Sequence, residues 1–234
     1  MKRTNMKNRA LPGMSGECWK ETAKTATFIL VVLSIAVANA ATVAFAQGGP
    51  PPDMKTMLSG PPPILTIDRP QTKTNGRLTV TSATFGANGQ IPVKNTGYGQ
   101  SISPAVAWSA GPKNTKSYVL IMEDATAGRD RKGVLHWIAF NIPPDVRNLP
   151  EGLPQTPAGM IVANNVEGKP QYTGPHAPVG GPPFHYHIQV FALDTALSLT
   201  SEASREAVWD AIDGHVLAKG DVVGTFQGPA QKAQ

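Results

Sequence analysis

Glycine and proline divide most of this chain into short segments, and this division limits the folds that it can adopt. The 234 residues include 23 glycines and 22 prolines. From residue 64 onward, runs rich in β-branched and other apolar residues are separated by turns that contain glycine and proline, a pattern typical of short strands joined by loops. The runs predicted to be strands are 64–68, 77–85, 105–109, 117–123, 134–142, 185–193 and 221–226.

Two of these runs, 117–123 and 188–193, are apolar almost throughout. Such runs are typical of strands that are covered on both faces, so both are expected in the middle of a sheet. One helix is predicted after them, with Thr200 or Ser201 as its N-cap, apolar residues at helical spacing and Gly214 as its C-terminal stop. The predicted fold class is therefore mostly β, with one or two peripheral helices.

The N-terminal residues 1–46 differ from the rest of the chain. Residues 1–24 contain six basic and two acidic residues, and residues 26–46 are almost entirely apolar and end in Ala-Phe-Ala. This order predicts a signal peptide that is removed before Gln47. The alternative is an uncleaved membrane anchor, because about twenty apolar residues can span a bilayer. The expected location is thus exported, either periplasmic or secreted, with residues 26–46 as a membrane anchor in the alternative case.

The same segment explains the net charge of +5 at pH 7. Without it, 15 basic and 14 acidic residues remain, so nucleic acid is not a predicted partner. The single cysteine, Cys18, precedes the apolar run, which excludes disulfides and thiolate chemistry from the remainder. Residues 47–63 are predicted to be a Pro/Gly-rich linker, residues 64–227 the folded domain, and residues 228–234 a disordered tail.

Three of the chain's five histidines lie close together, at His176, His185 and His187. The preceding segment, residues 172–184, contains three glycines and four prolines. Proline and glycine at this density disfavour sheet pairing but allow a rigid loop whose backbone N–H groups can approach a ligand closely. We therefore expect this loop to form the rim of a pocket.

The strand after the loop begins with His185, Tyr186 and His187. Alternation along a strand places the two histidines on one face and the tyrosine on the other. Two imidazoles on one face could hold a metal ion, with His136 or His176 as a third ligand. However, no carboxylate follows before Asp194, so the ligand set is incomplete and no metal is predicted.

A second group of polar residues follows the run 117–123. Asp124 stands at the end of that strand and His136 on the returning strand, so the carboxylate and the imidazole could face each other. Such a pair would hold the ring in one tautomer and raise its pKa, and a positive imidazole attracts phosphate or carboxylate ligands. The charged residues 129–132 between them are interpreted as a solvated turn. No nucleophile elbow, Walker A motif or dinucleotide fingerprint is present.

Two motifs in the chain resemble signatures of the phosphatidylethanolamine-binding protein family, in its bacterial Raf-kinase-inhibitor-like branch. EDATAG…LHWIAFNIP (123–143) is similar to the family's Asp-Pro-Asp-Ala-Pro and His-Trp, and GPHAPVGGPPFHYHIQVFALD (174–194) to its Gly-Pro-x-x-Pro-x-Gly and His-Arg-Tyr. The resemblance covers roughly residues 64–227. It implies a central antiparallel β-sheet packed on a smaller sheet with peripheral α-helices. It also implies a small cavity for phosphate-like anions and phospholipid head groups, with no common catalytic reaction.

The resemblance also implies individual site residues. Asp124 matches the first-motif aspartate, His136 the first-motif histidine and His185 the second-motif histidine. Thr126 stands where the family has a second aspartate, and His187 adds an imidazole, so the pocket should be less negative and should prefer an anion to the ethanolamine ammonium group. The ligand-binding residues implied in this way are Asp124, Thr126, His136, Gly174, Pro175, His185 and His187.

The predicted function is that of an exported binding protein whose ligand is a small phosphate-type anion or a phospholipid head group. No catalytic residue and no cofactor are predicted. Two alternatives stay open, a regulatory module that binds and inhibits another protein, and a metal-dependent enzyme that uses the histidine cluster. Membrane contact is expected only through the N-terminal segment or a bound lipid, and the sequence allows a homodimer as well as a monomer.

Overall fold

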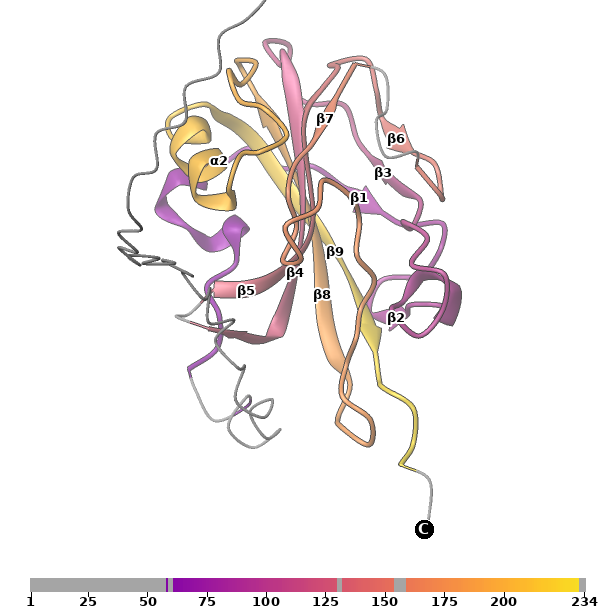
Figure 1. Ribbon diagram of the computed structural model, residues 1–234. Coiled ribbons are helices and arrows are strands. Elements are labelled where there is room, and N and C mark those ends of the chain that lie inside the picture. The colour runs from indigo at the N-terminus through magenta and orange to yellow at the C-terminus, as the bar shows by residue number, and fades with distance from the viewer. Residues whose placement is uncertain (1–57, 59–60, 130–131, 154–158, 232–234) are drawn as a thin grey trace, which may run out of the picture. The chain divides into compact units, whose positions relative to one another are not determined.

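The computed structural model describes residue 58 and residues 61–129, 132–153 and 159–231. Within these ranges the chain forms two β-sheets, with α2 (Arg205–Ile212) on the outer face of the larger one (Figure 1). The strands are β1 (Val80–Thr81), β2 (Gly89–Gln90), β3 (Val106–Trp108), β4 (Ser117–Arg129), β5 (Lys132–Ile142), β6 (Asn148–Leu149), β7 (Ile161–Val162), β8 (Phe184–Leu193) and β9 (Val216–Phe226). Three short 3₁₀ helices are η1 (Thr66–Asp68), η2 (Pro70–Thr72) and η3 (Val93–Asn95).

The larger sheet has the strand order β2-β9-β8-β4-β5-β7, and the smaller sheet has the order β1-β3-β6. All neighbours pair antiparallel except β2 and β9, which pair parallel. The two runs expected at the centre of a sheet, 117–123 and 188–193, lie in the neighbouring strands β4 and β8, which confirms that prediction. Their side chains are buried because one face of the sheet packs on the smaller sheet and the other on α2.

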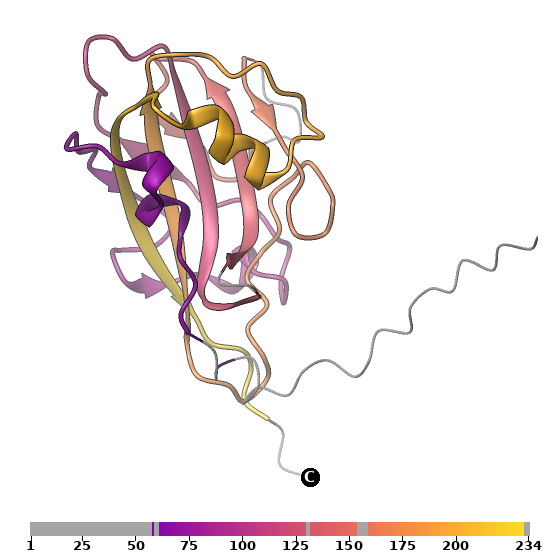
Figure 2. The same ribbon diagram turned by 90° about the vertical axis from the view of Figure 1, so that its left-hand side faces the viewer.

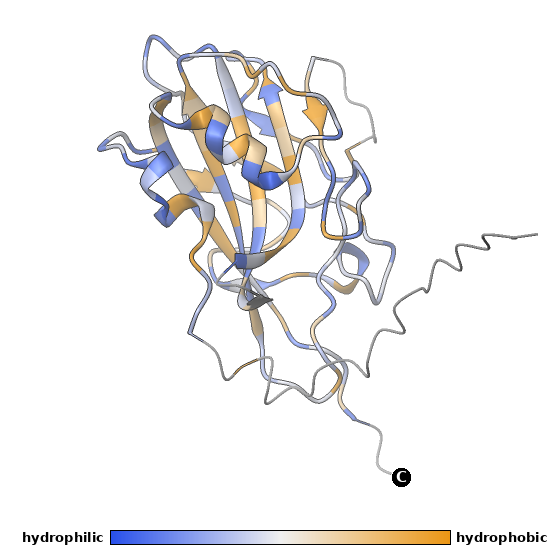
Figure 3. Ribbon diagram, turned by 60° about the vertical axis from the view of Figure 1, so that its left-hand side comes forward, coloured by the Kyte–Doolittle hydropathy of each residue, from blue (hydrophilic) through white to orange (hydrophobic). Residues whose placement is uncertain are grey.

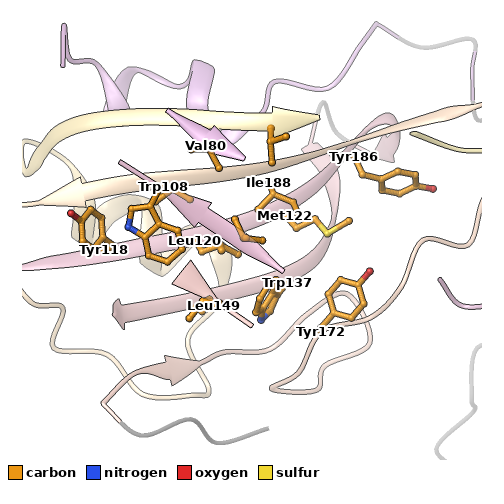
Figure 4. Packing of buried hydrophobic residues seen from close by; sticks show 14 of the residues in the cluster. Val80, Trp108, Tyr118, Leu120, Met122, Trp137, Leu149, Tyr172, Tyr186 and Ile188 are labelled. Carbon is orange, nitrogen blue, oxygen red and sulfur yellow. The ribbon is translucent and has the colours of Figure 1, made fainter. Parts of the chain in front are cut away.

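Each face of the larger sheet contributes to a separate hydrophobic cluster. The cluster between the sheets joins Trp108 of β3 to Met122, Trp137 and Ile188 of the larger sheet (Figure 4). The other cluster joins β4, β5 and β8 to α2, and Figure 3 shows hydrophobic positions on the strands behind this helix. Figure 2 shows that α2 and the indigo η1–η2 segment lie in front of the same face. The mostly β fold class with a peripheral helix is therefore confirmed.

Two predicted strands differ in the structure. Residues 64–68 do not form a strand but lead into η1, because side chains of the large sheet bind the backbone there. Glu123 Oε2 accepts the Thr66 N–H at 2.7 Å, and Gln189 Oε1 accepts the Ile67 N–H at 2.6 Å. Of the predicted strand 77–85, only β1 forms.

The predicted helix is present but begins later than expected. Its N-cap is Ser204, whose hydroxyl accepts the Ala207 N–H at 3.1 Å, and not Thr200 or Ser201. A side-chain oxygen that accepts an N–H of the first turn satisfies one of the unpaired donors of the helix, which explains why the helix starts there. Gly214, with φ of +77°, follows its C-terminal end as predicted.

Part of the predicted C-terminal tail packs on the domain. Gly228 is buried, and the Pro229 carbonyl accepts the Gly180 N–H at 2.8 Å. The predicted disorder of residues 228–234 is therefore wrong for Gly228 and Pro229, which are held by the loop before β8. Within the described ranges no helix is long and apolar enough to cross a membrane. The predicted signal segment 1–46 and most of the linker 47–63 lie outside the described residues.

Candidate functional site

Asp124 lies in β4 directly opposite Tyr186 of β8. Its side chain is buried, and Oδ1 accepts the backbone N–H of Thr126 at 2.7 Å and of Ala127 at 3.2 Å. Thr126 is in turn held by the His185 N–H, which donates to Thr126 Oγ1 at 2.9 Å. These bonds fix the carboxyl group and leave Asp124 Oδ2 without a partner among the described residues.

Burial determines the charge of Asp124. It raises the pKa of this carboxyl group to about 7, against the opposing effects of the Thr126 and Ala127 N–H groups, of His187 and of the Thr126 hydroxyl. Desolvation disfavours the charged form of a buried acid. Asp124 therefore keeps its proton to a higher pH than an exposed aspartate does. Because Oδ1 already accepts two N–H groups, the proton of the neutral form belongs on Oδ2.

His136 lies in β5 where the register with β4 shifts between the pairs Met122–Trp137 and Glu123–Leu135. The irregularity re-aims the inserted side chain. The buried ring has its Nδ1 3.0 Å from the Thr173 carbonyl, so Nδ1 carries the proton. No described residue contacts Nε2 with a hydrogen bond.

The expected positive charge on His136 is contradicted by this environment. Burial lowers the pKa of His136 to about 4, so the ring is neutral at pH 7. The partner that orients the ring is the Thr173 carbonyl, so the predicted pairing of His136 with the Asp124 carboxylate is wrong. A neutral imidazole with a proton on Nδ1 presents Nε2 as a hydrogen-bond acceptor.

Tyr186 completes the group and was not among the residues predicted from the sequence. Its ring meets that of His136 edge-on, with centroids 5.2 Å apart, and its side chain is buried. Burial, and then the nearby Asp124 charge, raises the pKa of the Tyr186 phenol, so the hydroxyl stays protonated. No hydrogen bond joins this hydroxyl to any described residue. Figure 4 shows Tyr186 at the end of the core opposite Tyr118.

The Gly/Pro-rich loop is fastened to residues 95–101. The Pro175 carbonyl accepts the Gly97 N–H at 2.8 Å, and the Tyr172 hydroxyl donates to the Asn95 carbonyl at 2.6 Å. A Cβ on Gly174 would lie 2.5 Å from the Thr96 carbonyl carbon, so only glycine fits there. Gly174 and Pro175 are therefore buried residues that hold the loop beside Thr173, the partner of His136.

His185 and His187 do not join this group. Both lie on the opposite face of β8 from Tyr186, as the alternation predicted. His185 is exposed, and His187 Nδ1 lies 2.7 Å from Asp221 Oδ2. If Tyr186 is the tyrosine of the His-Arg-Tyr motif, Phe184 and not His185 occupies its histidine position, so the residue-by-residue match was displaced by one.

The histidines are thus divided between the two faces of the larger sheet. His136 lies with Tyr186, and His187 lies with Asp221. In the part of the chain that the structure describes, no group of three or more His, Cys, Asp or Glu side chains is arranged to hold a metal ion. Alternation along the strand separated Tyr186 from the two histidines in the sequence, but only the pairing of β8 with β4 places it opposite Asp124.

Comparison with known proteins shows the family of this chain. The model of the phosphatidylethanolamine-binding protein family matches residues 81–227, which include Asp124, His136 and Tyr186. The chain belongs to the phosphatidylethanolamine-binding protein family. It is therefore a binding protein of that family, and both motifs quoted from the sequence lie inside the matched range.

Relatives of this family member are found in archaea and bacteria. The UPF0098 protein PH1269 of Pyrococcus horikoshii is 40% identical over 151 residues, which cover 62% of this chain and 75% of that protein. The solved structure of the homologue CT736 of Chlamydia trachomatis is 31% identical with a TM-score of 0.59, and that of YbcL of E. coli, described as a member of the mammalian family, is 26% identical with a TM-score of 0.60. Each comparison covers 65% of this chain and 99% of the other.

Proposed function

We propose that this phosphatidylethanolamine-binding protein family member binds small phosphate-type oxyanions, free or as phospholipid head groups, beside Asp124, His136 and Tyr186. The observation that carries the proposal is that three polar atoms lack hydrogen-bond partners. Asp124 Oδ2, His136 Nε2 and the Tyr186 hydroxyl belong to buried side chains, yet none has a partner among the described residues. None of the three atoms is sealed from solvent, so a ligand that enters from solvent can form hydrogen bonds with them.

The chemistry of the three atoms favours a partly protonated oxyanion. The Tyr186 hydroxyl and the neutral form of Asp124 are donors, whereas Nε2 of the neutral His136 ring is an acceptor. A hydrogen phosphate group accepts from the two donors and uses its own O–H to donate to His136. An oxyanion without a proton would place a lone pair against Nε2, and a buried acceptor left unpaired is costly.

We predict that inorganic phosphate at pH 6 binds the purified protein at least about tenfold more tightly than sulfate does, because sulfate cannot donate to His136. The measurement is an NMR titration that follows the amides of residues 124–127, 136 and 172–174 with each anion at constant ionic strength. Tyr186→Phe removes one donor and should weaken phosphate binding about tenfold.

Tyr118→Phe is the matched control for this titration. Tyr118 is also buried between the sheets, but its hydroxyl accepts the Gly111 N–H at 2.8 Å at the other end of the core (Figure 4). The Tyr118→Phe variant should leave the phosphate affinity unchanged while lowering the free energy of unfolding. Equal affinities for phosphate and sulfate, or for the wild type and Tyr186→Phe, would contradict the proposal.

We also propose that the protein acts after export. The support is the order of basic, apolar and small residues in segment 1–46. After expression of the full chain in a bacterium, N-terminal sequencing of the protein outside the cytoplasm should begin at Gln47. Replacing Ala46 by Asp should block cleavage, because the cleavage site requires small residues. A protein that keeps residues 1–46 and stays in the cytoplasm would refute this proposal.

A further inference from the structure

A cavity of about 540 Å³ lies on the other face of the larger sheet from Asp124 and Tyr186. Its walls come from β9 and from the segment that contains η1 and η2. Figure 2 shows this segment on the same side of the larger sheet as α2. His187, singled out by the sequence but absent from the first site, is part of the wall. The lining residues are Ile67, Asp68, Lys73, Thr74, Arg77, Leu78, His187, Lys219, Gly220 and Asp221.

The polar groups of this cavity are arranged in a defined way. His187 Nδ1 lies 2.7 Å from Asp221 Oδ2, and both side chains are only partly exposed, at 23% and 31%. A carboxylate at this distance orients the imidazole and leaves Nε2 for another partner. No hydrogen bond to Nε2 is made by any residue that the structure describes.

Cations outnumber acids around the cavity. Lys219 donates to the Ile67 carbonyl, with Thr72 Oγ1 also 3.5 Å away, and burial lowers the pKa of this ammonium group. The side chains of Lys73 and Arg77 make no hydrogen bond or ion pair with the described part of the chain. The cavity therefore combines the unpaired guanidinium of Arg77 and the unpaired ammonium group of Lys73 with Lys219, whose ammonium group is bound by the protein.

We propose that this cavity is a second ligand site, for a small oxyanion that also has a hydroxyl group. Arg77 can bind a carboxylate or phosphate in a bidentate manner, and Lys73 and Lys219 add positive charge. His187 Nε2, when the ring is neutral and Nδ1–H donates to Asp221, accepts the hydroxyl of the ligand. Asp68, the remaining carboxylate of the lining, disfavours a ligand of high negative charge.

NMR titrations of the protein with glycerol 3-phosphate and with glycerate test this proposal, and the comparison separates a phosphate from a carboxylate. Saturable shifts are expected at the amides of residues 67–78, 187 and 219–221. Glycerol, which lacks the anionic group, should leave these signals unchanged. The titrations are repeated with the Tyr186→Phe variant, in which the first site is weakened. The amides of residues 124–127 report binding at the first site separately.

Two variants make the test specific. Arg77→Gln, at an exposed side chain, should weaken binding at these amides about tenfold, which equals about 1.4 kcal/mol. His187→Gln should weaken glycerol 3-phosphate and glycerate more than sulfate, which has no hydroxyl group to donate. Lys113→Gln removes the same charge from an exposed residue outside the lining and should have no effect. Shifts confined to the first site, a linear response, or equal affinities in Arg77→Gln and Lys113→Gln would overturn the second site.

Discussion

Replacement of Arg205 by alanine is expected to lower the free energy of unfolding by about 3–5 kcal/mol. Arg205 Nη1 lies 2.7 Å from Glu123 Oε1, and the Glu123 side chain is fully buried. The other carboxylate oxygen accepts only neutral donors, the Thr66 N–H at 2.7 Å and the Gln189 amide at 2.8 Å. Without this guanidinium group, the buried carboxylate would lose its one charged hydrogen-bond donor and keep only the electrostatic effect of Arg69, so the fold would be destabilised.

Two comparisons make this result specific to the buried pair. Lys132→Ala breaks an ion pair of equal length, 2.7 Å, with Glu206 of α2, but those side chains are 38% and 46% exposed. The expected loss there is below about 1 kcal/mol. The double variant Glu123→Gln with Arg205→Met removes both charges and should recover most of the lost stability. Equilibrium urea unfolding measures all of them, and equal losses for Arg205→Ala and Lys132→Ala would contradict the prediction.

The second expected result concerns the pH dependence of stability. Burial raises the pKa of Asp124 from 3.8 to about 7, so the folded protein holds a proton that the unfolded chain has lost between these pH values. Stability from this group therefore falls as pH rises. Burial lowers the pKa of His136 from 6.5 to about 4, so the unfolded chain binds the extra proton in that window. Stability from His136 therefore increases with pH.

The two contributions are opposite in sign and similar in size, so they largely cancel in the wild type between about pH 4 and 6.5. Relative to the wild type, Asp124→Asn should gain stability as pH rises through this window, and His136→Gln should lose it. Each difference should reach on the order of 3 kcal/mol, because one pKa unit corresponds to about 1.4 kcal/mol. Urea unfolding at a series of pH values measures these differences, and three parallel curves would disprove both pKa shifts.

Several features of the fold could be predicted because they depend on neighbours in the sequence. The continuous apolar runs 117–123 and 188–193 could only be stable with both faces covered, and they became the adjacent central strands β4 and β8. The helix followed from periodic apolar residues and from Gly214. Predictions based on β propensity alone were less accurate, since residues 64–68 are bound by the side chains of Glu123 and Gln189 instead of by another strand.

The candidate site was only partly predictable. Asp124 and His136 were found because each stands at a recognisable place in a motif. Tyr186 was missed because alternation predicts only that Tyr186 and the two histidines His185 and His187 point to different faces of the sheet. It does not predict which face Asp124 shares. The contact with His136 identifies that face.

The amino-acid sequence by itself determined the strand-rich fold class, the two central strands, the family and the alternation of Tyr186 with the histidines. These features depend on local chemistry and on short repeating patterns. Only the tertiary structure decided that His136 is neutral, that Arg205 neutralises Glu123 and that His187 pairs with Asp221. Burial and contacts between distant residues create these properties, because the charge of a side chain depends on the solvent and partners that the folded chain leaves to it.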